Sequence, residues 1–491
     1  MGALIFFLIF VLSLLAIAVI YFIDVTQTTQ TIRRNYPVVG RFRYFFEHMG
    51  EFFRQYFFAM DREELPFNRA ERSWVYRAAK NVDTTIAFGS TRPLNQKGEA
   101  IFLNSPFPAL SKDVAKPRSI TIGEGYCEQP YSTHSIINVS AMSFGAISQP
   151  AVIALSKGAK AAGIWLNTGE GGLSSYHLEG GCDIVYQIGT AKYGVRDADG
   201  NLSDEKLKAI ASHEQVRMFE IKMSQGAKPG KGGILPGAKV TEEVALIRGI
   251  AVGHDSISPN GHEDIRSVAD LLDMIERVRK VTGKPVGFKM VVGGIEFFQD
   301  LFTEIHRRGI ASAPDFITLD SADGGTGAAP QALMDYVGMP LSESLPLVVN
   351  ALLSFGLRDR IRVIAAGKLI TPGKVALALA VGADFVTTAR GFMFALGCIQ
   401  ALQCNKNTCP TGITTHDADL QRGLVPADKA LRVERYAQKI VYDVGMIAHS
   451  CGVSEPRNLK RSHVRIIEYS GHTIPLLDIH PEPAVKDEYN S

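Results

Sequence analysis

The sequence predicts an α/β protein built on a (β/α)8 TIM barrel, with an N-terminal transmembrane helix, a cap region and a cysteine-rich loop after the eighth strand. Eight short β-rich runs alternate with helical segments between residues 137 and 389. Eight is the number of parallel strands that closes such a barrel. The rival fold, a doubly wound open sheet, would carry a glycine-rich fingerprint after its first strand, and none follows residues 137–142.

The expected strands are short runs of apolar, β-branched and aromatic residues. They lie at residues 137–142, 164–169, 218–223, 255–259, 286–292, 315–320, 362–367 and 384–389. Segments with helical periodicity, such as residues 268–281 and 372–383, separate several of them. This alternation predicts parallel strands joined by right-handed crossovers.

The composition is that of a globular protein. Of the 491 residues, 46% are hydrophobic and 21% charged, which excludes a disordered or collagen-like chain. The formal net charge of +2 excludes nucleic-acid binding driven by a strongly basic surface. Six cysteines are too few for a disulfide-rich secreted scaffold, so thiol or metal chemistry is the better interpretation.

An uncharged apolar run covers residues 3–23. As a helix it would be about 30 Å long, the thickness of the hydrocarbon core of a bilayer. It lacks the basic start and the cleavage site of a signal peptide, and no amphipathic segment nearby would cover it as a buried helix. The basic residues Arg33, Arg34, Arg41 and Arg43 follow it, which predicts a single-pass membrane protein with its catalytic domain in the cytoplasm.

The expected domain organisation follows from these features. Residues 1–24 form the transmembrane helix, 25–120 the juxtamembrane and cap region, 121–424 the barrel, and 425–491 a C-terminal helix, over 426–450, with a tail. Within the second part, residues 36–60 are aromatic and basic. This segment either lies on the membrane surface as an interfacial helix or packs against the body of the protein.

The loops after the predicted strands hold the candidate chemistry, because active sites of such barrels lie at the carboxyl ends of the strands. Glycines occur there beside charged side chains, and they allow backbone amides to approach a phosphate. These positions are residues 167–172 after the second strand, 222–230 after the third, Lys289 in the fifth, 320–327 after the sixth, 366–368 after the seventh and 390–391 after the eighth. The pattern predicts a phosphorylated cofactor.

Three cysteines, Cys398, Cys404 and Cys409, lie within twelve residues directly after the eighth predicted strand. A short run of thiolates that ends in proline is typical of an iron–sulfur ligand loop, and three local ligands suggest a cluster that lacks one corner iron. Two alternatives stay open. Zinc would use His416 as a fourth ligand, although the spacing lacks the usual close pair, or the three cysteines are simply buried residues.

The motifs together resemble one family. They are Ser-Ala-Met-Ser-Phe-Gly-Ala-Ile-Ser at 140–148, Asn-Thr-Gly-Glu-Gly-Gly at 167–172, Ile-Lys-Met-Ser-Gln-Gly-Ala-Lys-Pro-Gly at 221–230, Leu-Pro-Gly at 235–237, Asp-Gly-Gly-Thr-Gly-Ala-Ala-Pro at 323–330, Gly-Cys-Ile at 397–399 and Asn-Thr-Cys-Pro-Thr-Gly at 407–412. From about residue 120 to 455, the chain closely resembles the FMN-binding synthase domain of glutamate synthases. The membrane segment has no counterpart in the large subunit of those enzymes.

The resemblance implies an oxidoreductase of the CH–NH2 class, in which FMN and a [3Fe-4S] cluster serve the reduction of 2-iminoglutarate, formed from 2-oxoglutarate and ammonia, to glutamate. The cluster ligands would be Cys398, Cys404 and Cys409. The catalytic and substrate-binding residues would be Glu170, Lys222, Gln225, Lys228 and Arg248. The FMN-binding residues would be Ala141, Met142, Ser143, Asn167, Lys289, Asp323, Gly324, Gly325, Thr326, Gly327, Gly367, Lys368, Arg390 and Gly391.

The sequence shows neither a glutaminase domain before the barrel nor a dinucleotide-binding Gly-x-Gly-x-x-Gly motif. Ammonia is therefore expected to be free or to come from a separate glutaminase or other subunit. Electrons are expected from a ferredoxin, a reductase or a membrane donor. The chain also departs from the family pattern at Ile234, where the family has glutamine, and in residues 255–262, so the oxo acid itself stays open.

Alternative interpretations remain for both function and residues. One is a subunit of N-methylglutamate-synthase type, or an FMN-dependent dehydrogenase acting on another acid; another is a non-catalytic electron-transfer subunit. Lys222 could instead be a surface lysine, Arg248 a solvated helix residue and Glu170 a structural hydrogen-bond acceptor. The cluster of His254, His262 and Glu263 is interpreted as polar loop residues rather than a metal site.

Overall fold

The computed structural model describes residues 2–53 and 57–484 of the chain. It divides the chain into two compact units, Met1–Glu71 and Arg72–Ser491. The domain boundaries predicted after residues 24, 120 and 424 stay predictions. Within the predicted elements, residue 1 of the anchor, residues 54–56 of the juxtamembrane segment and residues 485–491 of the tail lie outside the described residues.

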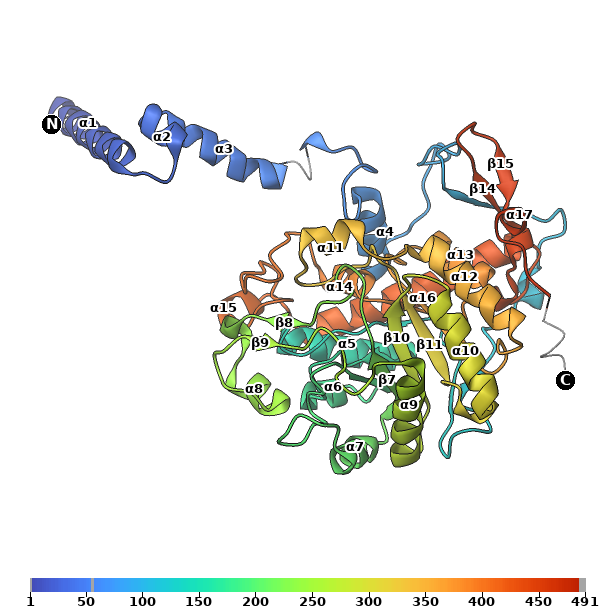
Figure 1. The fold of residues 1–491 in the computed structure, drawn as a ribbon. Coiled ribbons are helices and arrows are strands. Elements are labelled where there is room, and N and C mark those ends of the chain that lie inside the picture. Colours follow the sequence, from blue (N-terminus) through green and yellow to red (C-terminus); the bar gives the residue numbers. More distant parts are fainter. Residues whose placement is uncertain (1, 54–56, 485–491) are drawn as a thin grey trace. The chain divides into compact units, whose positions relative to one another are not determined.

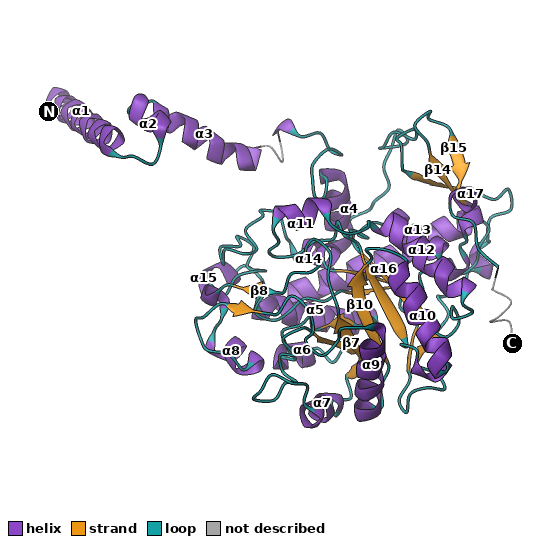
Figure 2. Cartoon of the chain, in the orientation of Figure 1, coloured by secondary structure: helices purple, strands orange, loops and turns teal. Residues whose placement is uncertain are grey.

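The second unit is built around a closed barrel of eight parallel strands, drawn as orange arrows inside the helices in Figure 2. The strands are β4 (Ile137–Val139), β5 (Leu166–Asn167), β6 (Ile184–Ile188), β7 (Val216–Lys222), β10 (Val286–Val291), β11 (Phe316–Asp320), β12 (Arg362–Ala366) and β13 (Phe385–Thr388). Each pairs in parallel with the next, and β13 pairs with β4 to close the ring. The (β/α)8 fold is confirmed.

Two of the predicted strands need correction. The run at 255–259 is not a barrel strand, because β9 (Ser256–Ile257) pairs with β8 (Ile234–Leu235) in a separate two-stranded hairpin. The third barrel strand is instead β6, whose residues were not among the predicted strands. The run at 218–223 is therefore the fourth barrel strand, and residues 222–230 follow strand four rather than strand three.

Helices surround the barrel on its outside, as Figure 1 shows. In chain order they are α4 (Arg69–Ala79), α5 (Gln149–Ala162), α6 (Ser175–Glu179), α7 (Asp204–Ala211), α8 (Glu242–Arg248), α9 (Val268–Thr282), α10 (Glu296–Arg308), α11 (Gln331–Tyr336), α12 (Leu341–Ser354), α13 (Pro372–Val381), α14 (Arg390–Leu396), α15 (Ala418–Gln421) and α16 (Pro426–Ser450). Most of them present a buried apolar face to the strands.

The outer ring closes where α16 packs against α5. Ser148 caps the start of α5 by accepting a hydrogen bond from the Ala151 amide, and Gly163 ends the helix with a left-handed φ of 66°. Gly158 lies at the contact, where a Cβ would stand 2.5 Å from the Cβ of Val433. The two helices can therefore approach closely only because this position is glycine.

The amino ends of the strands are closed by a two-stranded hairpin of β2 (Ile120–Ile122) and β3 (Tyr131–Thr133). Its side chains join one buried cluster with residues at the starts of the barrel strands, namely Ile120, Ile122, Tyr131, Trp165, Val185, Met218, Phe316, Ile364 and Phe385. This apolar floor excludes water from that end of the barrel. The opposite end, where the strands finish, is left for the site.

The C-terminal region folds back on residues that precede the barrel. β14 (Val464–Ile467) pairs on one side with β1 (Ala100–Phe102) and on the other with β15 (Thr473–Pro475), both antiparallel, and α17 (Leu476–Ile479) follows. The predicted tail is therefore an ordered part of a small three-stranded sheet, as far as residue 484.

The described residues of the first unit include the helices α1 (Gly2–Thr26), α2 (Thr31–Asn35) and α3 (Gly40–Phe53). α1 is long enough and apolar enough to cross a membrane, and nearly all its apolar side chains are exposed. Length and composition alone also fit a signal sequence, so membrane insertion is taken up below as a proposal.

Candidate active site

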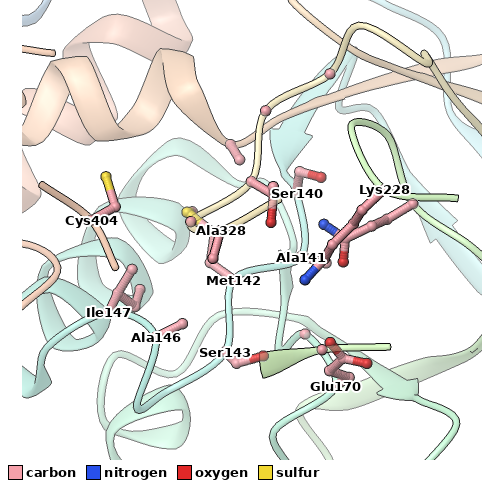
Figure 3. Close-up of a pocket in the computed structure, with 18 of the residues that line it drawn as sticks. Ser140, Ala141, Met142, Ser143, Ala146, Ile147, Glu170, Lys228, Ala328 and Cys404 are labelled. Atoms are coloured by element: carbon pink, nitrogen blue, oxygen red, sulfur yellow. The ribbon is translucent and has the colours of Figure 1, made fainter. Parts of the chain in front are cut away.

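One large cavity opens at the carboxyl ends of the barrel strands, with a volume of about 1360 Å³ including its open mouth. Many of the residues singled out in the sequence line it: Ala141, Met142, Ser143, Glu170, Lys222, Gln225, Lys228, Arg248, Lys289, Gly324, Gly325, Thr326, Gly327, Gly367, Lys368, Arg390 and Cys404. Figure 3 shows Glu170 and Lys228 on one side of this cavity and Cys404 on the other, with Met142 between them.

Glu170 and Lys222 form an ion pair within the cavity. The Lys222 Nζ lies 2.8 Å from Glu170 Oε1 and donates to Gln225 Oε1 at 2.5 Å. Burial alone would raise the pKa of Glu170, but the charge and hydrogen bond of Lys222 outweigh it and the pKa is lowered. Glu170 is therefore an ionised carboxylate at neutral pH. Lys222 is buried, so the interpretation of it as a surface lysine is wrong.

The position of Glu170 depends on two glycines from neighbouring loops. A Cβ at Gly189, which follows β6, would lie 2.6 Å from the Glu170 Cβ, and a Cβ at Gly233 would lie 2.5 Å from Glu170 Oε1. Real Cβ atoms do not approach so closely, so either substitution would displace the carboxylate. The chain thus leaves space for this one side chain at the junction of three loops.

Lys228 and Arg248 add two buried cations. Arg248 donates from Nη1 to Ser256 Oγ at 3.1 Å and from Nη2 to the Phe144 carbonyl at 3.3 Å, while its Nε has no hydrogen-bond partner among the described residues. Burial lowers the pKa of both side chains, and the nearby Lys222 lowers that of Lys228 further. Arg248 is not a solvated helix residue. Three buried cations around one carboxylate leave a positive excess that suits an anionic ligand.

The loops after β11, β12 and β13 form another wall. Lys368 Nζ lies 3.1 Å from the carboxylate of Asp323, and Arg390 Nη2 donates to the Thr326 carbonyl at 2.6 Å. Gly367 has a φ of 123°, and a Cβ there would stand 2.2 Å from the Ser321 Cβ, so only glycine fits. Lys368 and Arg390 therefore stand beside the glycine-rich segment 324–327 that also lines the cavity.

Some predicted residues do not line this cavity. Asp323 does not line the cavity but forms an ion pair with Lys368, which does. A Cβ at Gly391 would lie 2.2 Å from the Tyr436 hydroxyl, so that glycine serves the packing of α14 against α16. Asn167 lines a much smaller cavity inside the barrel, which it shares with Lys289 and Glu220.

Glu220, which was not among the predicted site residues, is a buried carboxylate in the barrel interior. It accepts hydrogen bonds from Asn167 Nδ2 at 2.9 Å, Gln187 Nε2 at 2.7 Å and Thr318 Oγ1 at 2.6 Å. These donors come from three different strands. Glu220 therefore ties β5, β6 and β11 to its own strand directly below the large cavity.

We expect Glu220→Ala to lower the free energy of unfolding markedly, because it leaves three buried donors without an acceptor and each costs about 1–3 kcal/mol. Glu220→Gln keeps one acceptor oxygen. Its free energy of unfolding should therefore lie between those of Glu220→Ala and the parent. Chemical denaturation followed by circular dichroism measures both. Equal stability of all three proteins would show that water replaces the carboxylate at no cost.

The three cysteines of the loop differ in their surroundings. Burial raises the pKa of Cys398 to about 11, whereas hydrogen bonds from Thr411 and Thr414 outweigh burial and lower the pKa of Cys409. The Cys404 sulfur lies 3.9 Å from Arg390 Nη1. Among the described residues, no three His, Cys, Asp or Glu side chains are arranged to hold a single metal ion.

A zinc site with His416 finds no support in this arrangement. His416 Nε2 instead contacts the Gly145 carbonyl at 2.8 Å. His262 is also engaged elsewhere, with its Nε2 lying 3.0 Å from the Lys222 carbonyl. Both histidines therefore hold loops around the cavity in place.

Further lining residues were missed from the sequence. Gln187 lies on the unassigned strand β6, and Lys239 is almost fully buried, donating to the carbonyls of Ala146 at 3.1 Å and Cys404 at 2.8 Å. Burial lowers the pKa of Lys239 to about 8. The β-rich run at 184–188 was a usable signal for Gln187. Nothing in the local sequence marks Lys239, whose role depends on contacts with distant segments.

The fold and the cavity define the class of protein: a (β/α)8-barrel enzyme whose cation-lined site lies where the strands end and suits a ligand with several negative charges. The chain belongs to the glutamate synthase family, a family of oxidoreductases. Residues 91–454 match the family model described as a conserved region in glutamate synthase.

Individual relatives agree with this assignment. The chain is 40% identical to the glutamate synthase large subunit-like protein YerD of Bacillus subtilis, over 93% of this chain and 94% of that protein. It is 33% identical to an archaeal-type glutamate synthase [NADPH] of Thermotoga neapolitana, over 70% of this chain. This match covers only 64% of the length of the Thermotoga protein.

Among solved structures, a lactate oxidase, described as putative, of Pediococcus acidilactici superposes with a TM-score of 0.48 at 13% identity. The match covers 81% of this chain and 95% of that one. The barrel assignment rests on the strand pairing of this chain and not on that likeness.

Proposed function

We propose that the protein is an FMN-dependent oxidoreductase of the CH–NH2 class that forms glutamate from 2-oxoglutarate and ammonia through 2-iminoglutarate. The observation that carries the proposal is the grouping of Glu170, Lys222, Lys228, Arg248 and Lys289 around one cavity at the ends of the barrel strands. Family membership supports the same reaction type. The names of the relatives are consistent with it.

The cavity residues fit FMN. Lys368, Arg390 and the amides of residues 324–327 offer cations and N–H donors suited to its phosphate, and the absence of side chains at the glycines allows close approach. Ala141, Met142 and Ser143 would flank the ring system, and Lys289 would stabilise negative charge on it. When bound, FMN would supply the hydride that reduces the imine carbon.

The buried charged side chains of the cavity would bind the substrate. 2-Oxoglutarate carries two carboxylates, and Lys222, Lys228 and Arg248 provide buried cations to bind them, with Gln225 fixing the Lys222 ammonium. Because Glu170 is ionised, its carboxylate accepts rather than donates hydrogen bonds. It would therefore hold ammonia, or the protonated imine nitrogen, at its Oε atoms beside the carbon to be reduced.

The loop after β13 would hold a [3Fe-4S] cluster through Cys398, Cys404 and Cys409. The surroundings of two of them suit thiolates, since Arg390 Nη1 lies 3.9 Å from the Cys404 sulfur and the Thr411 hydroxyl 3.3 Å from the Cys409 sulfur. The Cys398 sulfur accepts from the Gln400 amide at 3.5 Å, but burial raises its pKa, so iron would have to displace its proton. A three-iron cluster takes one thiolate per iron, so these ligands need not converge on one point as those of a single ion do. The cluster would pass electrons from a separate ferredoxin or reductase.

α1 would anchor the protein as a single-pass membrane protein with the catalytic domain in the cytoplasm. The basic residues after α1 support this orientation. Ammonia would be free or be delivered by a separate glutaminase or other subunit.

A direct test uses the detergent-solubilised protein with its cofactors, reduced chemically without oxygen. Adding 2-oxoglutarate and ammonia together should reoxidise the flavin, seen as a rise in its visible absorbance, and glutamate should appear. Neither reagent alone should do so. A flavin that stays reduced with both reagents would refute the proposal.

A second candidate is a synthase of N-methylglutamate type, or a dehydrogenase acting on another acid. The observation that favours it is Ile234, which lines the cavity where the family pattern has an amide. An apolar side chain tolerates an alkyl group better than an amide does. Faster flavin reoxidation with methylamine than with ammonia would select this candidate.

The affinity for 2-oxoglutarate is expected to fall as the pH rises, at pH values below about 10.4, where an ordinary lysine titrates. Burial lowers the pKa values of Lys222 and Lys228, so these side chains lose their charge earlier than a solvated lysine. Each charge-assisted hydrogen bond that is lost should weaken binding about tenfold or more. Calorimetric titration with 2-oxoglutarate alone avoids the separate ionisation of ammonia.

Lys228→Met should bind weakly and show a flatter pH profile than the parent. Lys157→Met, which removes an exposed lysine paired with Glu179, is the matched control and should keep the parental profile. Affinity that stays constant across this pH range would contradict the assigned role of these lysines.

A further inference from the structure

The helix α3 carries an apolar stripe that is largely exposed, except towards its end, where the Phe53 ring packs against that of Phe57 with the centroids 5.2 Å apart. Phe42, Phe45, Phe46, Met49 and Phe53 recur at the three- and four-residue spacing that places side chains on one helix face. Phe42, Phe45 and Phe46 are each more than half exposed, at 59%, 55% and 64%. A contiguous exposed patch of such side chains marks a surface that binds a partner or a membrane.

The opposite face of α3 is polar. Arg43, Tyr44, Glu47 and His48 lie there by the same spacing. The helix is therefore apolar on one side and hydrophilic on the other along its described length. This pattern is typical of a helix that lies in a boundary between water and an apolar phase.

A buried carboxylate fixes the start of α3 next to the end of α1. Asp24, which has no exposed surface, accepts from Arg33 Nη2 at 2.6 Å, from Arg41 Nε at 2.9 Å and from the Val38 amide at 3.0 Å. Gly40 allows the close turn, because a Cβ there would lie 2.7 Å from the Ile32 carbonyl oxygen. Asp24 therefore joins α1, α2 and the first turn of α3.

The charges around this junction match a lipid surface. Arg33 and Arg41 share the single carboxylate of Asp24, which leaves one positive charge among the three, and Arg34 and Arg43 have no carboxylate partner within the part of the chain that the structure describes. Anionic headgroups attract such basic side chains. The apolar stripe and the two unpaired arginines thus fit the two layers of a membrane surface, acyl chains and headgroups.

We propose that α3 lies flat on the cytoplasmic surface of the bilayer that α1 enters, with its stripe of Phe42, Phe45, Phe46, Met49 and Phe53 inserted among the lipids. This inference rests on the proposed membrane anchor. The occupant is the bilayer because α1 is apolar all round and the Asp24 junction holds the start of α3 at the end of α1. The Asp24 junction fixes the exit direction of the chain, and α3 makes the second contact with the membrane.

The test places a tryptophan on each face of α3 in the full-length protein, reconstituted in nanodiscs containing anionic lipids. Phe46→Trp reports on the stripe, and Tyr44→Trp is the matched aromatic control on the polar face. Leu14→Trp, in the middle of α1, reports on the anchor. The parent, whose native tryptophans are Trp74 and Trp165, gives the background signal.

Lipids brominated near the top of the acyl chain should quench most of the added fluorescence of Phe46→Trp and little of that of Tyr44→Trp. Deeply brominated lipids should quench Leu14→Trp. If Leu14→Trp is quenched and Phe46→Trp is not, α1 enters the bilayer but α3 packs elsewhere, and the inference fails. If the Phe46 and Tyr44 variants are quenched equally, the face assignment is wrong. If neither the Leu14 nor the Phe46 variant is quenched, the anchor itself is refuted.

Discussion

Replacing Glu170 with glutamine is expected to lower the rate of glutamate formation by about 10²–10⁴-fold, the usual contribution of a positioned acid–base group. The substitution keeps the size and one acceptor oxygen but removes the negative charge. Lys222, whose Nζ lies 2.8 Å from Glu170 Oε1, would then lose its ion-pair partner. The nitrogen of ammonia or of the protonated imine would lose the anion proposed to hold it.

The reaction can be resolved into steps to locate this effect. Binding of 2-oxoglutarate alone should be retained or strengthened, because the three cations no longer face a competing carboxylate. Flavin reoxidation in the presence of both reagents should be slow even at saturating 2-oxoglutarate. The loss should therefore fall on the rate constant for reoxidation rather than on the dissociation constant of the oxo acid.

The matched control is Glu179→Gln, which removes the charge of an exposed glutamate in an ion pair with Lys157, also at 2.8 Å. Exposed pairs contribute little, so parental activity and stability are expected. If Glu170→Gln retains the parental rate of reoxidation, the carboxylate is structural. If it loses only affinity for 2-oxoglutarate, the role assigned to Glu170 in handling nitrogen is wrong.

The barrel could be predicted because its evidence is local: β-rich runs that alternate with segments of helical periodicity. The count of eight was nevertheless reached through two errors that offset each other. Residues 255–259 resemble a strand, but they pair with β8 in a surface hairpin, and the run at 184–188 is a fully buried strand. Alternation alone cannot tell which runs pair in the barrel, because pairing depends on contacts between distant segments.

The residues of the site also differ in whether local sequence or contacts between distant segments reveal them. The charged residues at strand ends could be found from sequence because their neighbouring glycines and motifs mark them. Glu220 could not, since its carboxylate matters only when β5, β6 and β11 bring Asn167, Gln187 and Thr318 to it. Lys239 is a similar case, because it is held by carbonyls more than ninety residues away along the chain.

Replacing Cys404 with serine is expected to abolish turnover that depends on a protein electron donor, while the chemically reduced flavin still reacts with 2-oxoglutarate and ammonia. A serine oxygen is a poor substitute for a thiolate ligand of iron. The variant should therefore contain much less iron and lose the electron paramagnetic resonance signal of a three-iron cluster. Cys404 is only partly buried, so the fold should survive the change.

The matched control is Cys127→Ser, another partly buried thiol, whose sulfur lies 3.5 Å from the Asp315 carboxylate. A serine can make the same hydrogen bond, so iron content and donor-linked turnover should stay at the parental level. Parental iron in Cys404→Ser would refute the cluster assignment. Loss of the chemical half-reaction along with iron would mean instead that the cysteine loop shapes the cavity itself, which Cys404 lines together with Arg390. The two readouts separate electron entry from the chemistry at the substrate, because only the first depends on the cluster.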